Sequence, residues 1–167
     1  MRRRDYYSVI RTVLATYLGR EDFRVVHGSI QDSHFHFLIE AAGKRALSRG
    51  AQGLAIRLSK ALTGGRGKVF EERYHAVQIL SARQARNTLA YVLNNWRRHR
   101  ADGTSQAPVD RYSSGVTFTG WSERFRLRLP EEYEPLSLSQ PRTSLLASDW
   151  KRYGLIDPYE RPGPLWQ

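Results

Sequence analysis

Cysteine is absent from all 167 residues of this chain. This absence excludes a disulfide framework, a thiolate zinc site and a thiol nucleophile, so any metal ion must be held by nitrogen and oxygen ligands. The sequence also has no apolar run of membrane-spanning length, and its Arg-rich start lacks the apolar core of a signal peptide. We therefore expect a cytoplasmic protein that does not enter a membrane.

Proline is missing from the first 107 residues, and all seven prolines lie at Pro108 or beyond. We therefore expect regular structure in residues 1–101 and a turn-rich extension in residues 102–167. Acidic residues are also scarce in the first part, which carries 19 Lys and Arg against 7 Asp and Glu, whereas the extension carries 8 against 9. A net charge of +12 among interleaved aromatic residues is typical of a nucleic-acid-binding protein.

The hydrophobic pattern predicts regular elements along the first part of the chain. They are a helix over 4–18, strands over 23–30 and 33–40, a helix over 45–62, an extended segment over 69–80 and a helix over 81–100. This order predicts an α+β fold with helices packed on an antiparallel sheet. In the extension we expect short strands over 113–121 and 125–129, and a short helix around Leu145, Leu146 and Trp150.

Two histidines lie at alternate positions of the second predicted strand. Because side chains alternate between the faces of a strand, His34 and His36 project side by side, while Phe35, Phe37 and Ile39 form a buried opposite face. Two neighbouring imidazoles are a natural pair of ligands for a divalent ion. The alternative is that they are two packed or surface histidines, which is common for so short a motif.

The last predicted helix carries a polar stripe. Tyr91 and Asn95 are four residues apart and Arg98 lies nearby, so they share a side of the helix. The apolar stripe lies elsewhere and consists of Ala85, Leu89, Val92, Leu93 and Trp96. Tyr91 is either an ordinary half-buried aromatic residue or a nucleophile. Two histidines, an amide and a tyrosine make a metal-assisted phosphodiester nuclease one candidate.

Together these features resemble the single-tyrosine HUH transposases, in particular the REP-associated tyrosine transposases. The resemblance is carried by His34-Phe35-His36, the extended segment 70–76, the helical Tyr91-Val92-Leu93-Asn94-Asn95, and the tail segments 112–115, 120–121 and 154–158. It implies a ferredoxin-like (RRM-like) antiparallel sheet with helices on one face. It also implies a catalytic domain over residues 1–101 and an extension over 102–167 that docks on it.

The resemblance further implies the roles of the site residues. His34 and His36 would be metal ligands, Asn95 the third ligand, and Tyr91 the nucleophile. The metal would be Mg²⁺ or Mn²⁺, and the substrate single-stranded or hairpin DNA. Cleavage would give a 5′-phosphotyrosine and a free 3′-hydroxyl group.

The basic residues are the predicted DNA contacts. Those we expect to bind DNA are Arg57, Lys60, Arg66, Lys68, Arg73, Arg97 and Arg98. The glycine-rich loop 63–68 is not a P-loop, because Val69 stands where the magnesium-binding Ser or Thr belongs. His27 and His75 are expected to contact phosphate or solvent. We expect association with the nucleoid, and both a monomer and a homodimer remain open.

One departure concerns the start of the chain, which opens directly into a helix where relatives have a strand first. We expect the sheet to lack that strand, with residues 116–118 or 125–129, a second chain, or nothing filling its place. We favour marginal folding with partial closure of the sheet.

Several other functions compete with the transposase. The alternatives are a degenerate transposase that binds DNA without cutting it, and a sheet-faced RNA or DNA binder. Histidine-triad hydrolases and two-histidine phosphoesterases fit poorly, because Leu38 stands where a third alternating histidine belongs and no second histidine motif is present.

Overall fold

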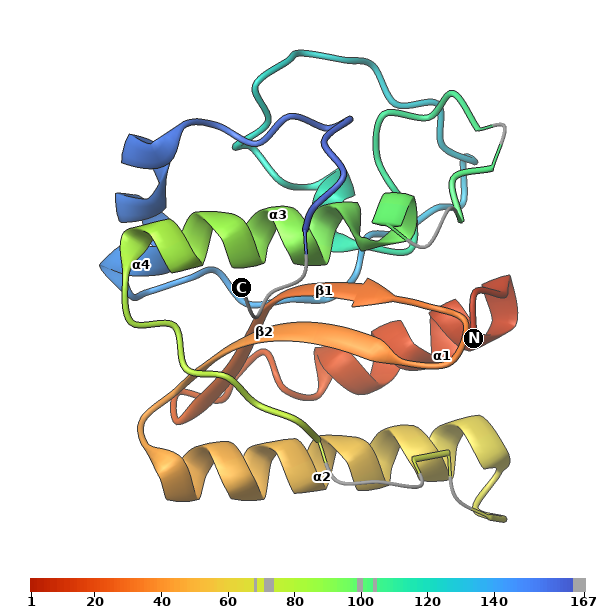
Figure 1. The fold of residues 1–167 in the computed structure, drawn as a ribbon. Helices are drawn as coiled ribbons and strands as arrows, with labels where there is room; N and C mark the ends of the chain where they lie inside the picture. Colours follow the sequence, from red (N-terminus) through yellow and green to blue (C-terminus); the bar gives the residue numbers. More distant parts are fainter. Residues whose placement is uncertain (68, 71–73, 99–100, 104, 164–167) are drawn as a thin grey trace.

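The computed structural model describes residues 1–67, 69–70, 74–98, 101–103 and 105–163. The elements are α1 (Arg4–Ala15), β1 (Phe23–Ile30), β2 (Phe35–Ala41), α2 (Lys44–Thr63), α3 (Ala82–Arg98), the 3₁₀ turn η1 (Ser114–Val116), α4 (Ser144–Ala147) and the 3₁₀ turn η2 (Asp149–Tyr153) (Figure 1). This arrangement confirms the predicted α+β class.

The helices begin and end where the local sequence favours it. At the start of α3, the Ser81 hydroxyl accepts a hydrogen bond from the backbone N–H of Gln84, whose side chain in turn accepts one from the N–H of Leu80. At the end of α2, Gly64 adopts a left-handed conformation with φ of 61°, and its N–H donates to the carbonyl of Lys60. Sequence periodicity therefore located both helices closely.

The two strands form an antiparallel hairpin in which Ser29 lies opposite His36. A bulge interrupts the register between Val25 and His27, so that Val26 and His27 both stand opposite Leu38. Such a bulge turns both residues of the bulged pair toward the same face. That face is the one that carries His36.

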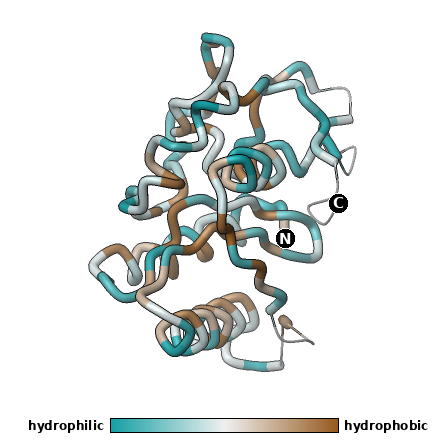
Figure 2. Tube along the Cα trace, turned by 60° about the vertical axis from the view of Figure 1, so that its left-hand side comes forward, coloured by the Kyte–Doolittle hydropathy of each residue, from teal (hydrophilic) through white to brown (hydrophobic). Residues whose placement is uncertain are grey.

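The hairpin lies between two helical layers (Figure 1). Phe35, Phe37 and Ile39 pack on one side against the core of α1 and α2, while Val26 and Leu38 pack on the other against α3. Figure 2 shows the apolar segments gathered between these layers. The prediction that the helices share one face is therefore wrong, because the apolar stripe of α3 covers the second face of the hairpin.

The extended segment predicted over residues 69–80 forms no strand in its described part. Phe70 packs near Phe35, with 5.6 Å between ring centroids, and Ile79 contacts the core, but Leu80 is 71% exposed. Because so little apolar surface is buried here, nothing fixes a strand register.

The tail shares the core of the N-terminal part. Trp121, Trp150 and Ile156 are buried in one cluster with α3, and Phe118 stacks on Trp150 with 5.6 Å between ring centroids. The short helix predicted around Trp150 is confirmed by α4 and η2. The strands predicted over 113–121 and 125–129 are wrong, because the first contains the turn η1 and the second pairs with no described strand.

The outer edge of β1 is covered by the tail. The N–H of Ile30 donates to the carbonyl of Tyr112, the N–H of Gly28 to the hydroxyl of Ser114, and the N–H of Ser139 to the carbonyl of Val25. These bonds satisfy backbone groups that an edge strand would otherwise leave to solvent. These bonds come from Tyr112, Ser114 and Ser139 and not from residues 116–118 or 125–129, one of the outcomes left open by the sequence, and the favoured outcome of marginal folding stays a prediction.

Candidate active site

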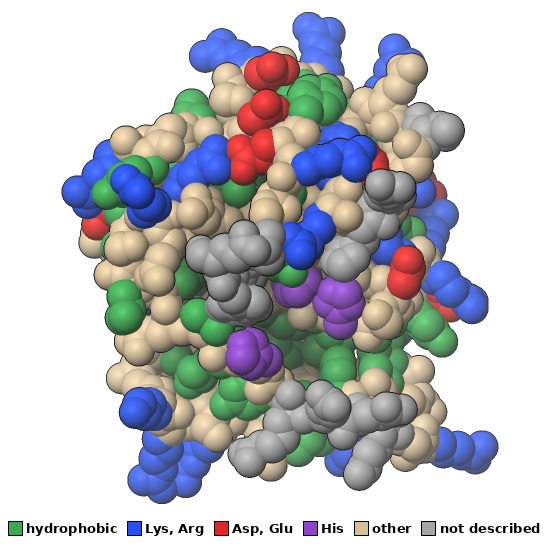
Figure 3. Space-filling model, viewed as in Figure 1, with side chains coloured by type: hydrophobic (Ala, Val, Ile, Leu, Met, Phe, Trp, Pro, Cys, Tyr) green, Lys and Arg blue, Asp and Glu red, His purple; other side chains and the backbone are tan. Residues whose placement is uncertain are grey.

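His34, directly before β2, and His36, within it, converge as their alternate positions require. The Nε2 atoms of His34 and His36 are 3.0 Å apart, and both side chains are half-buried. Figure 3 shows histidine side chains near the middle of one face of the molecule, beside a hollow lined by hydrophobic side chains. The two ring nitrogens therefore point at a common place on the surface.

Helix α3 brings Tyr91 to this pair. The centroid of its ring lies 5.1 Å from that of His36, at an angle of 82° between the rings. The contact depends on the apolar stripe of α3, in which Leu89 and Leu93 are fully buried in the cluster that contains Leu38. Burial of that stripe fixes the rotation of the helix and aims Tyr91 at the hairpin.

Asn95 lies one helical turn beyond Tyr91 and is completely buried. Among the residues that the structure describes, neither its Oδ1 nor its Nδ2 atom has a hydrogen-bond partner. The neighbouring Asn94 differs, because its Nδ2 donates to the carbonyl of Asp157 at 2.9 Å. A buried amide without partners costs about 1–3 kcal/mol per unsatisfied group, so its retention calls for an explanation.

The separation of the two histidine nitrogens matches that of two neighbouring ligands on a divalent ion. Two ligand nitrogens at right angles around an ion, with bonds of about 2.1 Å, lie about 3.0 Å apart, which is the separation of the two Nε2 atoms. The buried Oδ1 of Asn95 would supply an oxygen ligand. Within the described ranges no group of three or more His, Cys, Asp and Glu that could hold a metal ion gathers.

Arg98 adds a positive charge at the same place. Its guanidinium carbon lies 5.6 Å from the centroid of the Tyr91 ring, and its Nη1 donates to the carbonyl of Pro162 at 3.3 Å. The side chain is exposed, so it is accessible to a phosphate group. Of the predicted DNA contacts that are described, Arg98 is the one that the structure brings to Tyr91.

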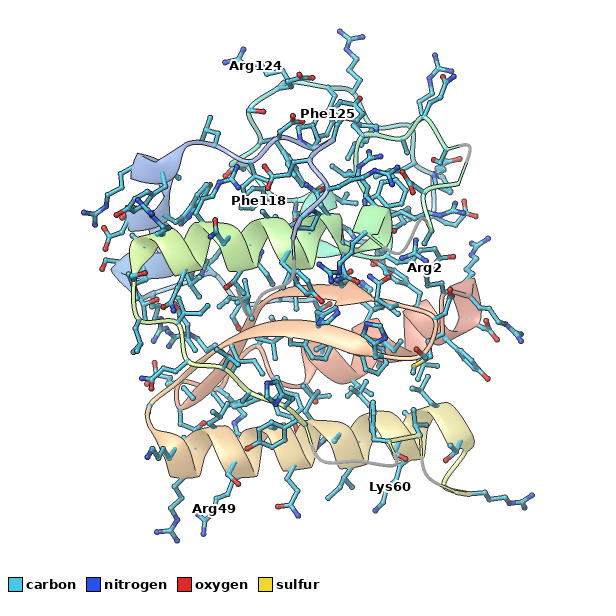
Figure 4. All side chains as sticks on the ribbon, viewed as in Figure 1. Arg2, Arg49, Lys60, Phe118, Arg124 and Phe125 are labelled. Carbon is cyan, nitrogen blue, oxygen red and sulfur yellow. The ribbon has the colours of Figure 1, made fainter. Side chains whose placement is uncertain are left out.

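Three other predicted DNA contacts lie elsewhere. Arg57 and Lys60 are exposed on α2, and Arg66 is exposed on the turn after it. The guanidinium of Arg57 lies over the ring of Tyr17, and Lys60 projects away from the hairpin (Figure 4). This surface is separated from the histidine pair by the hairpin itself. Lys68 and Arg73, also predicted DNA contacts, fall outside the described residues.

Arg97 requires a correction. It is only 6% exposed, and its guanidinium donates to the carbonyls of Pro158, Ala107 and Pro108 and pairs with Asp102. A guanidinium that is occupied in this way holds the tail on α3 and does not reach DNA. The sequence placed it in a basic run, but the partners that bury it lie 5 to 61 positions away.

His27 also requires a correction. It is largely buried beside Phe118 and Ser114, with its Nδ1 3.2 Å from the serine hydroxyl. Burial lowers the pKa of His27 from 6.5 to about 4, although the nearby charge of Glu40 opposes the shift. His27 is therefore neutral at pH 7 and contacts the tail, not phosphate. His75 is exposed, as expected.

A second basic surface was missed at the sequence level. Arg124, Arg126 and Arg128 are exposed in the tail, where they alternate with apolar residues. The alternation was visible in the sequence, but we interpreted it only as a short strand.

Comparisons with known proteins give no match, whether against protein-family models, curated proteins or solved structures. In the described part of the chain, no helix is long and apolar enough to cross a membrane. The resemblance to HUH transposases stays a prediction that rests on the residues of this site.

Proposed function

We propose that this protein cuts and rejoins single-stranded DNA, with Tyr91 as the nucleophile. The observation that carries the proposal is the contact between Tyr91 and His36, which come from α3 and β2 and whose ring centroids are 5.1 Å apart. A packed core could bury either residue without bringing them together. The convergence of His34, His36 and Tyr91, beside a buried amide on the same helix, supports a phosphodiester transesterification.

Tyr91 would act on the DNA phosphate. Its phenolic oxygen attacks phosphorus in line, the bond from phosphorus to the 3′ oxygen breaks, and the 3′ oxygen gains a proton as the phenol loses one. The products are a 5′-phosphotyrosine and a free 3′-hydroxyl group. Because the ester retains the free energy of the broken bond, a 3′-hydroxyl can reverse the reaction without a nucleotide cofactor.

His34, His36 and Asn95 would hold Mg²⁺ or Mn²⁺, which when bound neutralises charge on the non-bridging phosphate oxygens. Arg98 would contribute a second positive charge beside the Tyr91 ring, 5.6 Å from its centroid. An arginine there binds a phosphate oxygen through its planar fork of donors and orients the scissile group.

The complete burial of Asn95 favours a second candidate, a degenerate transposase that binds DNA without cutting it. In that case the amide would be a remnant of the ligand set. The two candidates differ in covalent chemistry and not in DNA binding.

A covalent adduct distinguishes these candidates. The protein is incubated with labelled single-stranded DNA and Mn²⁺, and the products are separated on a denaturing gel. We expect a shifted band with the wild-type chain and none with Tyr91→Phe. A band that persists in Tyr91→Phe contradicts the nucleophile, and no band with wild type supports the non-cutting candidate.

Metal binding is tested without DNA. Asn95→Leu replaces an unsatisfied buried amide with an apolar side chain of similar size, so the metal-free protein should become more stable by about 1–2 kcal/mol. The same variant should lose the rise in melting temperature that Mn²⁺ produces in wild type. If Mn²⁺ still stabilises Asn95→Leu as much as wild type, Asn95 is not a ligand.

A further inference from the structure

The tail contains a row of three arginines with a period of two residues. Arg124, Arg126 and Arg128, the arginine row, are exposed, whereas Phe125, Leu127 and Leu129 between them are partly buried. Alternating burial of this kind requires an extended backbone, with one set of side chains facing the core and the other facing solvent.

The inward side chains anchor this segment. Phe125 and Leu127 pack against the core cluster of α3 and the tail, and the Phe125 ring lies 6.2 Å from that of Trp121. Figure 4 shows Arg124 projecting outward at the end of the molecule opposite α2, while Phe125 lies closer to the body. In an extended chain, residues two positions apart are separated by about 6.7 Å. The arginine row therefore presents evenly spaced guanidinium groups on an anchored backbone.

The guanidinium groups of the arginine row are uncommitted. Within the described part of the chain, none of them makes a hydrogen bond or an ion pair. Glu123 and Glu131 flank the row in sequence but form no ion pair with it, and Glu132 is paired with Arg4. A linear, rigid and unpaired set of arginines fits an anionic polymer with regularly spaced charges.

We propose that the arginine row binds the phosphate backbone of duplex DNA in a hairpin stem. Neighbouring phosphates along a strand have a spacing close to that of the row, and arginine donors match phosphate oxygens in geometry. Single-strand binders add aromatic side chains on which bases stack, but the aromatic residue here, Phe125, faces inward. The row would thus contact the backbone alone. The identification of the polymer as DNA rests on the proposed function.

The salt dependence of binding gives the quantitative test. Each phosphate contact with a duplex contributes about 0.9 to the slope of log affinity against log salt concentration, so loss of three contacts lowers that slope by about 2.7. We expect the triple variant Arg124→Ala, Arg126→Ala, Arg128→Ala to lose affinity for a stem–loop DNA on the order of tenfold or more at low salt.

The matched control removes the same charge at the other end of the molecule. Lys44→Ala, Arg45→Ala, Arg49→Ala takes three exposed cations from the start of α2, and Arg49 projects away from the hairpin at the end opposite Arg124 (Figure 4). For this control we expect the slope of log affinity against log salt concentration to differ from that of the wild-type protein by less than about 0.9, the contribution of one phosphate contact. An equal loss in both triple variants would overturn the proposal, because net charge and not the row would govern binding.

Competitors and a second readout separate the remaining outcomes. If the arginine-row variant loses as much affinity for a stemless single strand as for the stem–loop, the assignment to a stem is overturned. If polyglutamate competes with the stem–loop as well as DNA does, the assignment to nucleic acid is overturned. Adduct formation on a short stemless oligonucleotide should be unchanged in the arginine-row variant. If the wild-type protein binds the stem through the arginine row but forms no adduct, the proposed cutting function is overturned and the proposal for the row is supported. If the wild-type protein does not bind the stem, the proposal for the row is overturned, whether or not an adduct forms.

Discussion

Two sets of arginines, one in each part of the chain, differ in their partners. In residues 1–101, five of them pair with carboxylates of the tail: Arg2 with Asp110, Arg4 with Glu132, Arg11 with Glu134, Arg86 with Glu160 and Arg97 with Asp102. In the tail, whose net charge is −1, Arg124, Arg126 and Arg128 form no ion pair with any residue that the structure describes. Arginines that are free to bind an anion therefore occur in the tail as well as in residues 1–101, which carry the larger formal charge.

This contrast concerns what net charge means in a folded chain. Docking of the tail neutralises part of the charge of the +12 segment. In the buried pair of Arg2 with Asp110, Arg2 also donates a hydrogen bond to the carbonyl of Ile30 at the end of β1. A tail carboxylate that pairs with an arginine of residues 1–101 is not available to the arginines of the tail itself. Arginines that hold the fold and arginines that face solvent should respond differently to substitution, salt and pH.

The largest effect is expected at Arg97. Arg97→Ala removes the donor to three carbonyls and one of the two arginine partners of Asp102, the other being Arg161, and breaking a buried pair of this kind costs about 3–5 kcal/mol. Arg98→Ala, which truncates the side chain of the next residue of α3, should cost less than about 1 kcal/mol, because the Arg98 side chain is exposed. Urea unfolding of both variants measures the difference. Equal costs would remove the distinction between paired and solvent-facing arginines.

The contact of His27 with the tail should be sensitive to mild acid. Because its pKa is lowered to about 4 in the folded state, the unfolded chain takes up the proton first as pH falls from 6.5. The folded protein is then destabilised by up to about 3 kcal/mol between pH 6.5 and pH 4. His27→Gln should flatten this part of the stability curve. A wild-type curve that matches the variant throughout this range would contradict the burial of His27.

The contact of Glu40 with the tail should fail at lower pH. Burial alone would raise its pKa, but hydrogen bonds from Thr143, Arg24 and the N–H of Arg142 outweigh it and leave the pKa below 4.5. The stabilisation is therefore complete above about pH 4.5 and is lost as pH falls further. Glu40→Gln should cost about 2 kcal/mol at pH 7 and nothing extra in acid. Unfolding free energies measured from pH 7 to pH 3 test this; a cost that persists at pH 3 would contradict it.

The smallest effects belong to the exposed arginines. Arg4→Ala, which breaks the exposed pair with Glu132, should lower the free energy of unfolding only slightly, and less in high salt. Each alanine substitution in the arginine row should change stability by no more than about 0.5 kcal/mol. A larger cost for the row would mean that these arginines hold the tail as Arg97 does.

Sequence reasoning found the parts of the site that depend on local periodicity. The alternation of His34 with Phe35, and the four-residue spacing of Tyr91 and Asn95, fix directions within a strand and a helix. These directions need no knowledge of distant contacts. The packing of α3 on the face of β2 that carries Leu38 was not predicted, because the apolar face identified in the sequence, formed by Phe35, Phe37 and Ile39, packs against α1 and α2.

The remaining features depend on contacts between distant parts of the chain. The burial of Arg97 and His27 requires Pro158 and Ser114, which lie far along the chain in segments without regular patterns. The absence of a strand in the described residues of segment 69–80 likewise reflects how little of its apolar surface is buried, since Val77 and Leu80 are exposed. By contrast, the ion pair of Arg24 and Glu40 could have been predicted from the sequence, because the hairpin register places these residues opposite one another.

The closing of β1 by the tail also sets a schedule for synthesis. At about 5–20 residues per second, a ribosome needs about 5–20 s to proceed from Ile30 to Ser139, the last residue that bonds to β1. During that interval β1 has an open edge, and the apolar cluster of α3 lacks the tail residues Trp121, Trp150 and Ile156 that cover it. A chain cut after residue 101 would stay in that state permanently, so we expect it to require a chaperone or to aggregate, although both histidines and Tyr91 are present in it.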